Sequence, residues 1–275
     1  ITERVEAQNR IEELASKLSK YLSPQVYRSI FSGQKNVQIE ANRKKLTVFF
    51  SDIKDFTELT DRLEPEVLSS LLNSYLNEMS KIALKYGGTI DKFVGDAILI
   101  FFGDPETNGE KADATSCVLM ALEMRERMKF MRQIWEDEGI SKPLNIRIGI
   151  NTGYCNVGNF GSEDRLDYTI IGGEVNLASR LESNASVGQI LVSHETYSLI
   201  KNSITCEERE EINVKGLAHK VRTYQVIDKK EKNEKGVTKL KDNYEGFSLS
   251  IDLDVSRKAV VIASLKNALA KIQKN

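Results

Sequence analysis

The chain has 275 residues, of which 40% are hydrophobic and 29% are charged, and its formal net charge at pH 7 is -1. This length supports one catalytic-sized domain with appendages. The balanced charge disfavours a nucleic-acid partner, because a nucleic-acid-binding surface needs a basic excess or a basic stripe.

Cysteine spacing and hydropathy indicate the compartment in which the protein works. The three cysteines lie far apart and form no CxxC pair, which argues against a disulfide framework or a zinc site and favours a reducing compartment. No stretch approaches the ~18 apolar residues that a membrane helix needs. We therefore expect a cytoplasmic protein with no membrane segment in this part of the chain.

The N-terminal segment, residues 1–22, is charged and helix-favouring. Its apolar residues recur at spacings of three and four at Ile11, Leu14, Leu18 and Tyr21. This pattern indicates either the seam of a short coiled coil or an amphipathic helix that packs on its own domain. Ser23-Pro24 is expected to stop the helix, and residues 23–43 are expected to be a connector. The chain begins with Ile1 and shows no signal peptide, so we expect it to be part of a longer protein.

The next elements contain two aspartates that could meet at one sheet edge. The apolar run 46–52 predicts a strand that ends at Asp52, and a long helix follows from Pro65 to a glycine cap at Gly87-Gly88. Two strands, 89–94 and 97–102, are joined by Gly95-Asp96 as a type II′ turn. If these strands are neighbours, Asp52 and Asp96 meet at one sheet edge and form an oxygen-only site of the kind that suits Mg²⁺ or Mn²⁺.

The remaining elements complete a domain over 44–228. They are a helix at 111–138, a strand at 145–150, a turn at 151–153, a short helix at 175–181, and strands at 190–192 and 221–227. Strands alternating with helices predict an α/β or α+β sandwich. Residues 229–275 form a polar C-terminal extension with some order near 247–253 and a helical pattern near 260–272, which we expect to dock on the domain or on a partner chain.

Three blocks of sequence resemble a known family in order and spacing. They are Phe49-Phe50-Ser51-Asp52-Ile53, the segment Gly87 to Asp96, and the segment Tyr168 to Glu182. Together they resemble the class III nucleotidyl cyclases over about 44–227. The resemblance implies an α+β fold, with a ferredoxin-like-derived sheet and flanking helices, preceded here by an N-terminal linker helix.

The resemblance also implies a two-metal mechanism. Asp52, Asp96 and the backbone carbonyl of Ile53 would hold two divalent cations, Mg²⁺ or Mn²⁺. One would activate the ribose 3′-hydroxyl for attack on the α-phosphorus, and the other would neutralise charge on the departing pyrophosphate. Asn176 would orient the ribose, and Arg180 would reach the phosphate in the transition state, since residues four apart share a helix face.

The remaining residues that match family positions would contact the phosphates and the base of the nucleotide. Arg147 and Lys215 resemble phosphate-binding cations. Lys92 and Thr169 resemble the base-reading pair, in which a Lys donor and a Thr acceptor complement adenine, so ATP is the expected substrate. A guanylate or relaxed purine cyclase stays an alternative, because the Thr hydroxyl can rotate to donate as well as to accept.

Each of these residues also has a simpler interpretation. Asp52 can cap the turn that follows it, and Gly95-Asp96 can be an ordinary hairpin turn. Lys92 can be a strand lysine paired with Asp91, Asn176 and Arg180 a polar pair on a helix surface, and Arg147 and Lys215 strand-edge cations. Lys54-Asp55 departs from the family, whose members commonly have Gly before Phe56, and places an extra carboxylate near the metal loop.

In this family each site forms between two catalytic domains, and this chain carries both sets of residues. The resemblance therefore implies a head-to-tail homodimer, with Asp52, Asp96 and Arg147 facing the other residues of the site on the second subunit. It also implies an upstream sensor domain that acts through the N-terminal helix. The alternative of another class is an inactive module that keeps the fold for dimerisation or nucleotide sensing.

Overall fold

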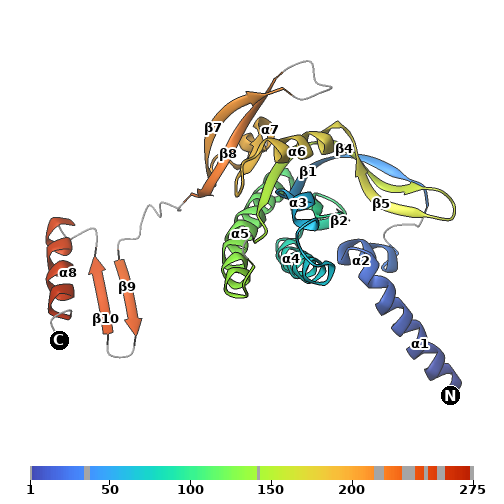
Figure 1. Ribbon diagram of the computed structural model, residues 1–275, viewed down its shortest axis with the longest axis horizontal. Coiled ribbons are helices and arrows are strands. Elements are labelled where there is room, and N and C mark those ends of the chain that lie inside the picture. Colours follow the sequence, from blue (N-terminus) through green and yellow to red (C-terminus); the bar gives the residue numbers. More distant parts are fainter. Residues whose placement is uncertain are drawn as a thin grey trace. The chain divides into compact units, whose positions relative to one another are not determined.

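The computed structural model describes residues 2–33, 38–140, 143–213, 220–230, 239–244, 247–252 and 258–272. The chain divides into two compact units, Ile1–Lys230 and Glu231–Asn275. The second unit holds an antiparallel hairpin of β9 (Lys239–Tyr244) and β10 (Phe247–Asp252), and the helix α8 (Lys258–Ile272) (Figure 1). The strand β10 and the helix α8 lie where the sequence predicts order in the C-terminal extension, whereas β9 was not predicted.

The first unit is built on one eight-stranded sheet with the order β2-β3-β1-β4-β6-β8-β7, and β5 pairs with β4. The pair β4 and β6 is parallel and the other pairs are antiparallel. The strands are β1 (Ala41–Ile53), β2 (Thr89–Val94), β3 (Ala97–Phe102), β4 (Ile146–Gly161), β5 (Leu166–Ile171), β6 (Ile190–Ser193), β7 (Ile204–Ile212) and β8 (Val221–Lys229).

Helices cover both faces of this sheet. Residues of α4 and α5 form the main core with Phe49 and Ile53 of β1, whereas Leu46 and Val48 pack on the other face with Ala178 of α6 (Figure 1). This alternation follows from the two-residue period of a strand. The helices are α1 (Thr2–Leu18), α2 (Pro24–Phe31), α3 (Phe56–Thr60), α4 (Pro65–Lys85), α5 (Glu110–Asp137), α6 (Gly173–Asn184) and α7 (His194–Ile200), with a 3₁₀ turn, η1, at Ser19–Tyr21.

The hairpin predicted at Gly95-Asp96 is confirmed. Strands β2 and β3 pair up to Val94 and Ala97, and Gly95 has a φ of +65°, as the first central residue of a type II′ turn requires. Asp96 therefore lies at the tip of the hairpin. The helices predicted from Pro65 and at 111–138 are α4 and α5, and their apolar periodicity gives each a buried face, from Leu71 to Ala83 and from Ala114 to Met128.

The prediction for residues 23–43 was wrong in part. Ser23 and Pro24 start a helix, α2, because the Ser23 hydroxyl accepts a hydrogen bond from the Val26 amide and proline is tolerated in the first turn. The preceding helix α1 ends at Leu18. Its seam residues Ile11 and Leu14 are 62% and 53% exposed, so α1 does not bury them on its own domain.

A second prediction was also wrong. Residues Asn151-Thr152-Gly153 do not turn the chain, because β4 continues through them to Gly161. Asn151 and Thr152 are buried in the sheet, where Asn151 donates to the Glu174 backbone carbonyl and Thr152 bonds the Thr47 hydroxyl. Buried polar groups with partners of this kind cost little. Strands β5 and β7 and the helix α7 were not predicted, and among the described residues no helix has the length and hydropathy to cross a bilayer.

Candidate active site

Two carboxylates meet where β1 ends and the β2–β3 hairpin turns. We call Asp52, Ile53 and Asp96 the metal end. The Ile53 amide donates to Asp96 Oδ2 at 3.0 Å, which holds the hairpin tip against the end of β1. The sequence prediction that strand neighbours bring Asp52 and Asp96 to one sheet edge is consistent with this contact.

The electrostatics of the metal end suit a divalent cation. Burial raises the pKa of the Asp96 carboxyl to about 7, and the neighbouring Asp52 carboxyl adds to the rise through a hydrogen bond and through charge repulsion. A dication between the two groups would replace this repulsion with attraction. The carboxylates and carbonyls present there are hard oxygen donors that fit Mg²⁺ or Mn²⁺.

The backbone carbonyl of Ile53 lies on the side of β1 that faces β3 and Asp96. Lys54 donates its amide to the Asn145 carbonyl of β4, so the preceding residue directs its amide and carbonyl to the opposite side, toward β3 and Asp96. Within the described ranges, no group of three or more His, Cys, Asp or Glu side chains is arranged to hold a metal. Remaining ligands of a cation here would be water and substrate phosphates.

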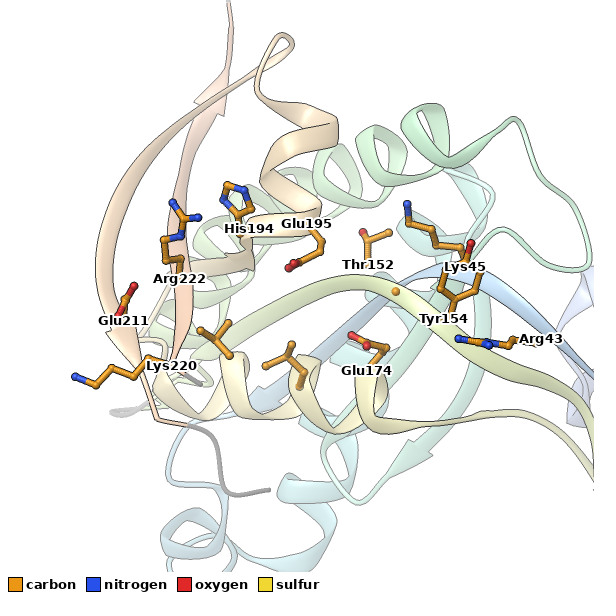
Figure 2. A pocket seen from close by; sticks show the side chains of 13 residues that line it. Arg43, Lys45, Thr152, Tyr154, Glu174, His194, Glu195, Glu211, Lys220 and Arg222 are labelled. Atoms are coloured by element: carbon orange, nitrogen blue, oxygen red, sulfur yellow. The ribbon is translucent and has the colours of Figure 1, made fainter. Parts of the chain in front are cut away.

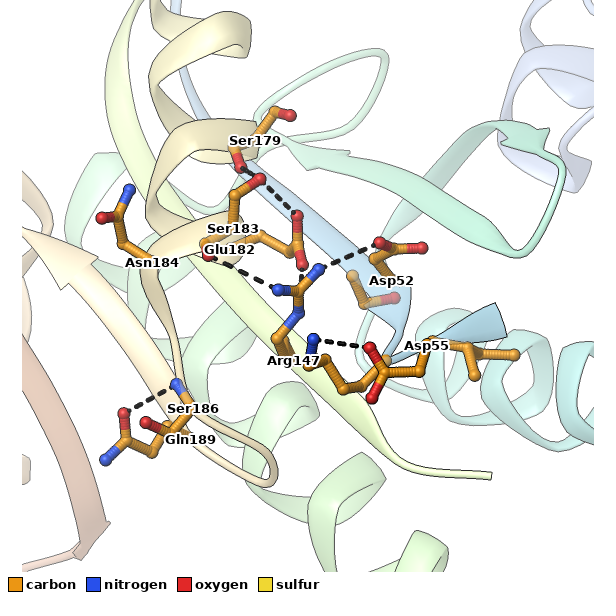
Figure 3. A network of polar contacts seen from close by, with 12 residues as sticks. Asp52, Asp55, Arg147, Ser179, Glu182, Ser183, Asn184, Ser186 and Gln189 are labelled. Carbon is orange, nitrogen blue, oxygen red and sulfur yellow. Dashed lines mark hydrogen bonds and ion pairs between the residues drawn. The ribbon is translucent and has the colours of Figure 1, made fainter. Parts of the chain in front are cut away.

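Arg147 lies beside Asp52 rather than free in solvent. The two residues are directly paired on β4 and β1, which places their side chains next to each other. Arg147 forms ion pairs with Asp52 (3.2 Å) and with Glu182 of α6 (2.9 Å), and the Glu182 side chain is 3% exposed (Figure 3). Burial raises the pKa of Glu182, while Arg147 opposes the rise.

The helix α6 can bring Glu182 to this point because it packs directly on β4. A Cβ added at Gly149 would lie 2.2 Å from the Ala178 carbonyl oxygen and 2.2 Å from the Glu182 amide nitrogen. Only glycine permits this approach, since both contacts are with backbone atoms. The close packing fixes the C-terminal half of α6, from Ala178 to Glu182, relative to β4 and the metal end.

The same helix carries Asn176 and Arg180, and both are exposed. In the part of the chain that is described, neither side chain forms a hydrogen bond or an ion pair. The structure therefore does not bring them together with Asp52 or Asp96 through any direct bond. They are available for contact with a ligand or with a second protein surface.

A separate cluster lies where β2 passes β5. We call Asp91, Lys92 and Thr169 the base end. The Thr169 hydroxyl donates to Asp91 Oδ2 at 2.6 Å, the Ile170 amide donates to the same oxygen at 3.2 Å, and Lys92 Nζ lies 3.3 Å from Asp91 Oδ1. The structure thus brings the predicted base-reading residues, Lys92 and Thr169, to one carboxylate.

A β-bulge explains how Asp91 reaches across to β5. Ile90 pairs with Ile100 and Lys92 pairs with Leu99, so Asp91 is the extra residue in β2. Bulges of this kind redirect a side chain, and the Asp91 side chain is only 1% exposed. Burial raises the pKa of Asp91, and the bonds from Thr169 and Lys92 oppose the rise.

Sequence reasoning missed Asp91 and Glu182 as members of the site. Asp91 entered only as a neighbour of Lys92, and Glu182 only as the end of a motif. A signal was available for each, because both are acidic residues within the resembling blocks and an acidic residue among apolar neighbours needs a partner. Lys215 lies outside the described residues, so its predicted role is still a prediction.

A cavity of about 660 Å³ lies elsewhere, between α6, α7 and the strands β1, β4 and β8 (Figure 2). None of the predicted site residues lines it. Several of its charged side chains have partners within the chain, since Lys45 pairs with Glu110, Arg43 stacks over Tyr154, and Asn151 donates to Glu174. The cavity is therefore separate from the candidate active site.

Comparisons with known proteins identify the family and the fold of this chain. The family model of the adenylate and guanylate cyclase catalytic domain matches residues 38–228. The adenylyl cyclase CyaB from P. aeruginosa is 65% identical, with a TM-score of 0.68, and the match covers 69% of this chain and 97% of that chain. For the guanylyl cyclase Cya2 the identity is 34% and the TM-score 0.67, over 71% of this chain and 98% of that chain.

A longer relative is the terminal-differentiation specific adenylate cyclase of Dictyostelium discoideum. It is 35% identical over 243 residues, which is 86% of this chain and 11% of that protein. This chain thus spans a small part of that relative. The α+β fold and the family resemblance predicted from the three motifs are both confirmed. The chain belongs to the family of adenylate and guanylate cyclase catalytic domains.

Proposed function

We propose that this chain is an adenylate cyclase that converts ATP to 3′,5′-cyclic AMP and pyrophosphate. The observation that carries the proposal is the paired Asp52 and Asp96 at one sheet edge, with a pKa near 7 at Asp96 that a bound cation would lower. Two divalent cations, when bound, supply activation of the 3′-hydroxyl and neutralisation of charge on pyrophosphate. The adenylate cyclases among its relatives support the choice of reaction.

The residues of the chain then act by position and charge. Asp52, Asp96 and the Ile53 carbonyl hold the cations. Arg147, in its ion pair with Asp52, is placed to bind a phosphate once cations occupy the carboxylates. No covalent intermediate on the protein is needed, since phosphoryl transfer depends mainly on positioning and electrostatic stabilisation.

Arg180 and Asn176 act from the second subunit of a homodimer. Their exposure on α6, away from any bond to the metal end of the same chain, supports this arrangement. Arg180 stabilises charge on the transferred phosphoryl group, Asn176 orients the ribose, and Lys215 binds phosphate. Lys92 and Thr169 bind the adenine edge, because N1 accepts a hydrogen bond and the exocyclic amine donates one.

Regulation enters through the N-terminus in this proposal. The exposed Ile11 and Leu14 of α1 pair with the same residues of a second subunit, and an upstream sensor changes how the two helices pack. Substitution of both by Ser is expected to weaken dimerisation and to lower the rate. Unchanged sedimentation and unchanged rate would contradict this part of the proposal. A cytoplasmic location follows from the use of ATP as substrate.

The first experiment incubates the purified chain separately with ATP and GTP, with Mg²⁺ or Mn²⁺, and quantifies cyclic nucleotide. Cyclic AMP that depends on metal and is absent from an Asp52→Ala/Asp96→Ala control is the expected result. Cyclic GMP as the main product would favour the guanylate cyclase alternative, which the resemblance to Cya2 keeps in view. No product from a dimeric preparation would favour the inactive module.

A second experiment tests the shared site. An Asp52→Ala chain mixed with an Arg180→Ala chain is expected to regain activity, because each heterodimer holds one intact site. Each variant alone serves as the control. Absence of recovery in a mixture shown to contain heterodimers would contradict sites formed between subunits.

A further inference from the structure

The hydrogen bonds of the base end fix the direction of the hydroxyl of Thr169, a residue that is 6% exposed. A threonine hydroxyl has one proton and two acceptor lone pairs, and in isolation it rotates to suit its partner. Here the proton is directed to Asp91 Oδ2 at 2.6 Å. The hydroxyl oxygen therefore has only acceptor capacity left for any group that approaches from outside.

A backbone group determines the role of Asp91 Oδ2. The Ile170 amide donates to this oxygen at 3.2 Å, and a backbone amide cannot reverse its role as donor. Asp91 Oδ2 is thus held as an acceptor by β5, next to Thr169. The other oxygen, Oδ1, faces Lys92 Nζ at 3.3 Å, and this positive charge opposes the rise that burial causes in the pKa of Asp91.

We propose that Asp91 is a specificity-determining positioning residue that makes Thr169 an obligate acceptor and so selects adenine over guanine. The inference rests on the proposed cyclase function and deepens it. The adenine amine donates a hydrogen bond and meets the Thr169 oxygen. The guanine carbonyl O6 accepts hydrogen bonds and meets the same oxygen without a proton between them, which leaves both acceptors unsatisfied.

Asp91 acts on Lys92 as well. The ion pair holds an otherwise exposed lysine, 42% exposed, near the start of the hairpin. A lysine donor complements N1 of adenine and opposes the N1 hydrogen of guanine. One buried carboxylate thus sets the donor at one end of the purine edge and the acceptor at the other, and the bulge at Asp91 makes this geometry possible.

The test compares Asp91→Ala with Asp91→Asn. In the Asn variant the Ile170 amide requires the side-chain oxygen on its side, so Thr169 keeps its acceptor partner and Lys92 faces the amide group. In the Ala variant the Thr169 hydroxyl is free to donate. Two readouts are taken for each protein: displacement of a fluorescent ATP analogue by ATP and by GTP in the presence of Ca²⁺, and kcat and KM with each nucleotide.

We expect Asp91→Ala to lower selectivity, measured as kcat/KM for ATP divided by kcat/KM for GTP, about tenfold. This is the effect of one hydrogen bond gained or lost at the base. KM for ATP rises and KM for GTP falls, while kcat with ATP changes less than about threefold. Asp91→Asn keeps the ratio within about threefold of the parent. A structural role alone would instead lower kcat for both nucleotides together.

Two results would overturn the inference. One is an unchanged ratio in Asp91→Ala, and the other is an equally large loss of the ratio in Asp91→Asn. If Asp91→Ala lacks a cooperative thermal transition, Asp91→Asn decides alone, by keeping or losing the ratio. The displacement assay separates this inference from the proposed function, because base selectivity without any cyclic product would refute the cyclase reaction and leave the role of Asp91 standing.

Discussion

The metal end and the base end both contain a buried or half-buried carboxylate, but they balance its charge differently. Asp91 faces partners from its own chain, namely the Thr169 hydroxyl, the Ile170 amide and the Lys92 ammonium group. Asp96 faces another carboxylate, which helps to raise its pKa to about 7. A carboxylate with partners inside the chain is suited to position its neighbours, whereas one that faces a like charge is a candidate for binding a cation, as we propose for Asp96.

The comparison is tested most strongly by removal of the metal-end carboxylates. Asp52→Ala or Asp96→Ala is expected to lower cyclic nucleotide production at saturating Mg²⁺ by at least about 10³-fold, because each removes a ligand that stabilises charge in the transition state. The matched control is Asp55→Asn, an exposed carboxylate of the same loop, which is expected to retain activity. Loss of less than tenfold in both Ala variants would refute the assignment.

The comparison of the two kinds of carboxylate also predicts effects on folding stability, first at Glu182. Its ion pair with Arg147 is internal to the chain, like the bonds of Asp91, so its removal should harm folding. Glu182→Ala is expected to lower the free energy of unfolding by about 2–3 kcal/mol, near the lower end for a broken buried pair because Arg147 keeps Asp52 as a partner. Urea denaturation measures this, with the exposed Ser186→Ala, which lies outside the contacts of Glu182, as control. Equal or greater stability of Glu182→Ala would contradict the internal role.

Substitution of Asp96 should have the opposite effect and raise the free energy of unfolding. The folded-state pKa of Asp96, about 7, lies above the usual value of 3.8 for an aspartate, so ionisation favours the unfolded state and the penalty grows from about pH 4 to pH 7. In the presence of a chelator, Asp96→Asn is therefore expected to raise Tm above that of the parent at pH 7.5. The gain is of order 1 kcal/mol, or about 2–4 °C, after allowance for solvent screening, and it vanishes near pH 4.

Thermal unfolding across this pH range checks the prediction. Saturating Mg²⁺ should reduce the difference at pH 7.5, because the cation stabilises only the parent at this position. A lower Tm for Asp96→Asn throughout would show that the like-charge pair is not a net cost.

The smallest expected effect concerns Asp55, a position where the family resemblance leads us to expect glycine. Asp55 has a φ of +59° at the start of α3, a left-handed conformation that glycine adopts without strain. Asp55→Gly is expected to stabilise by less than about 1 kcal/mol, because relief of strain is partly offset by greater freedom of the unfolded chain. Asp55→Ala, which tolerates positive φ less well than Asp, should be less stable than Asp55→Gly in thermal unfolding. The reverse order would show that the Asp55 carboxylate itself stabilises the loop.

The sequence predicted best what is decided locally. The Gly95-Asp96 turn, the apolar faces of α4 and α5, and the strand that ends at Asp52 all follow from patterns within a few residues. The proximity of Asp52 and Asp96 combines two of these local features, so it could be predicted, and their role in metal binding stays a prediction. The same local reasoning was wrong at Asn151, where a residue typical of turns is buried in a sheet and bonded to Glu174.

Contacts between distant residues could not be predicted in this way. Thr169 lies 78 residues from Asp91, and the direction of its hydroxyl depends on that contact. From the sequence, the hydroxyl was free to rotate and its selectivity was open. Arg147 likewise has two acidic partners, from β1 and α6, that depend on the register of β4 and on the close approach at Gly149.

Gly149 has a consequence for motion in the proposed dimer. With no side chain between them, β4 and α6 are in backbone contact at this point, and packed interiors of this density do not slide continuously. The strand that carries Arg147 and the helix that carries Arg180 therefore move as one rigid body. Opening and closing of an intersubunit site would then involve rotation of one subunit against the other, so we expect substitutions in the dimer interface to change the rate of product release.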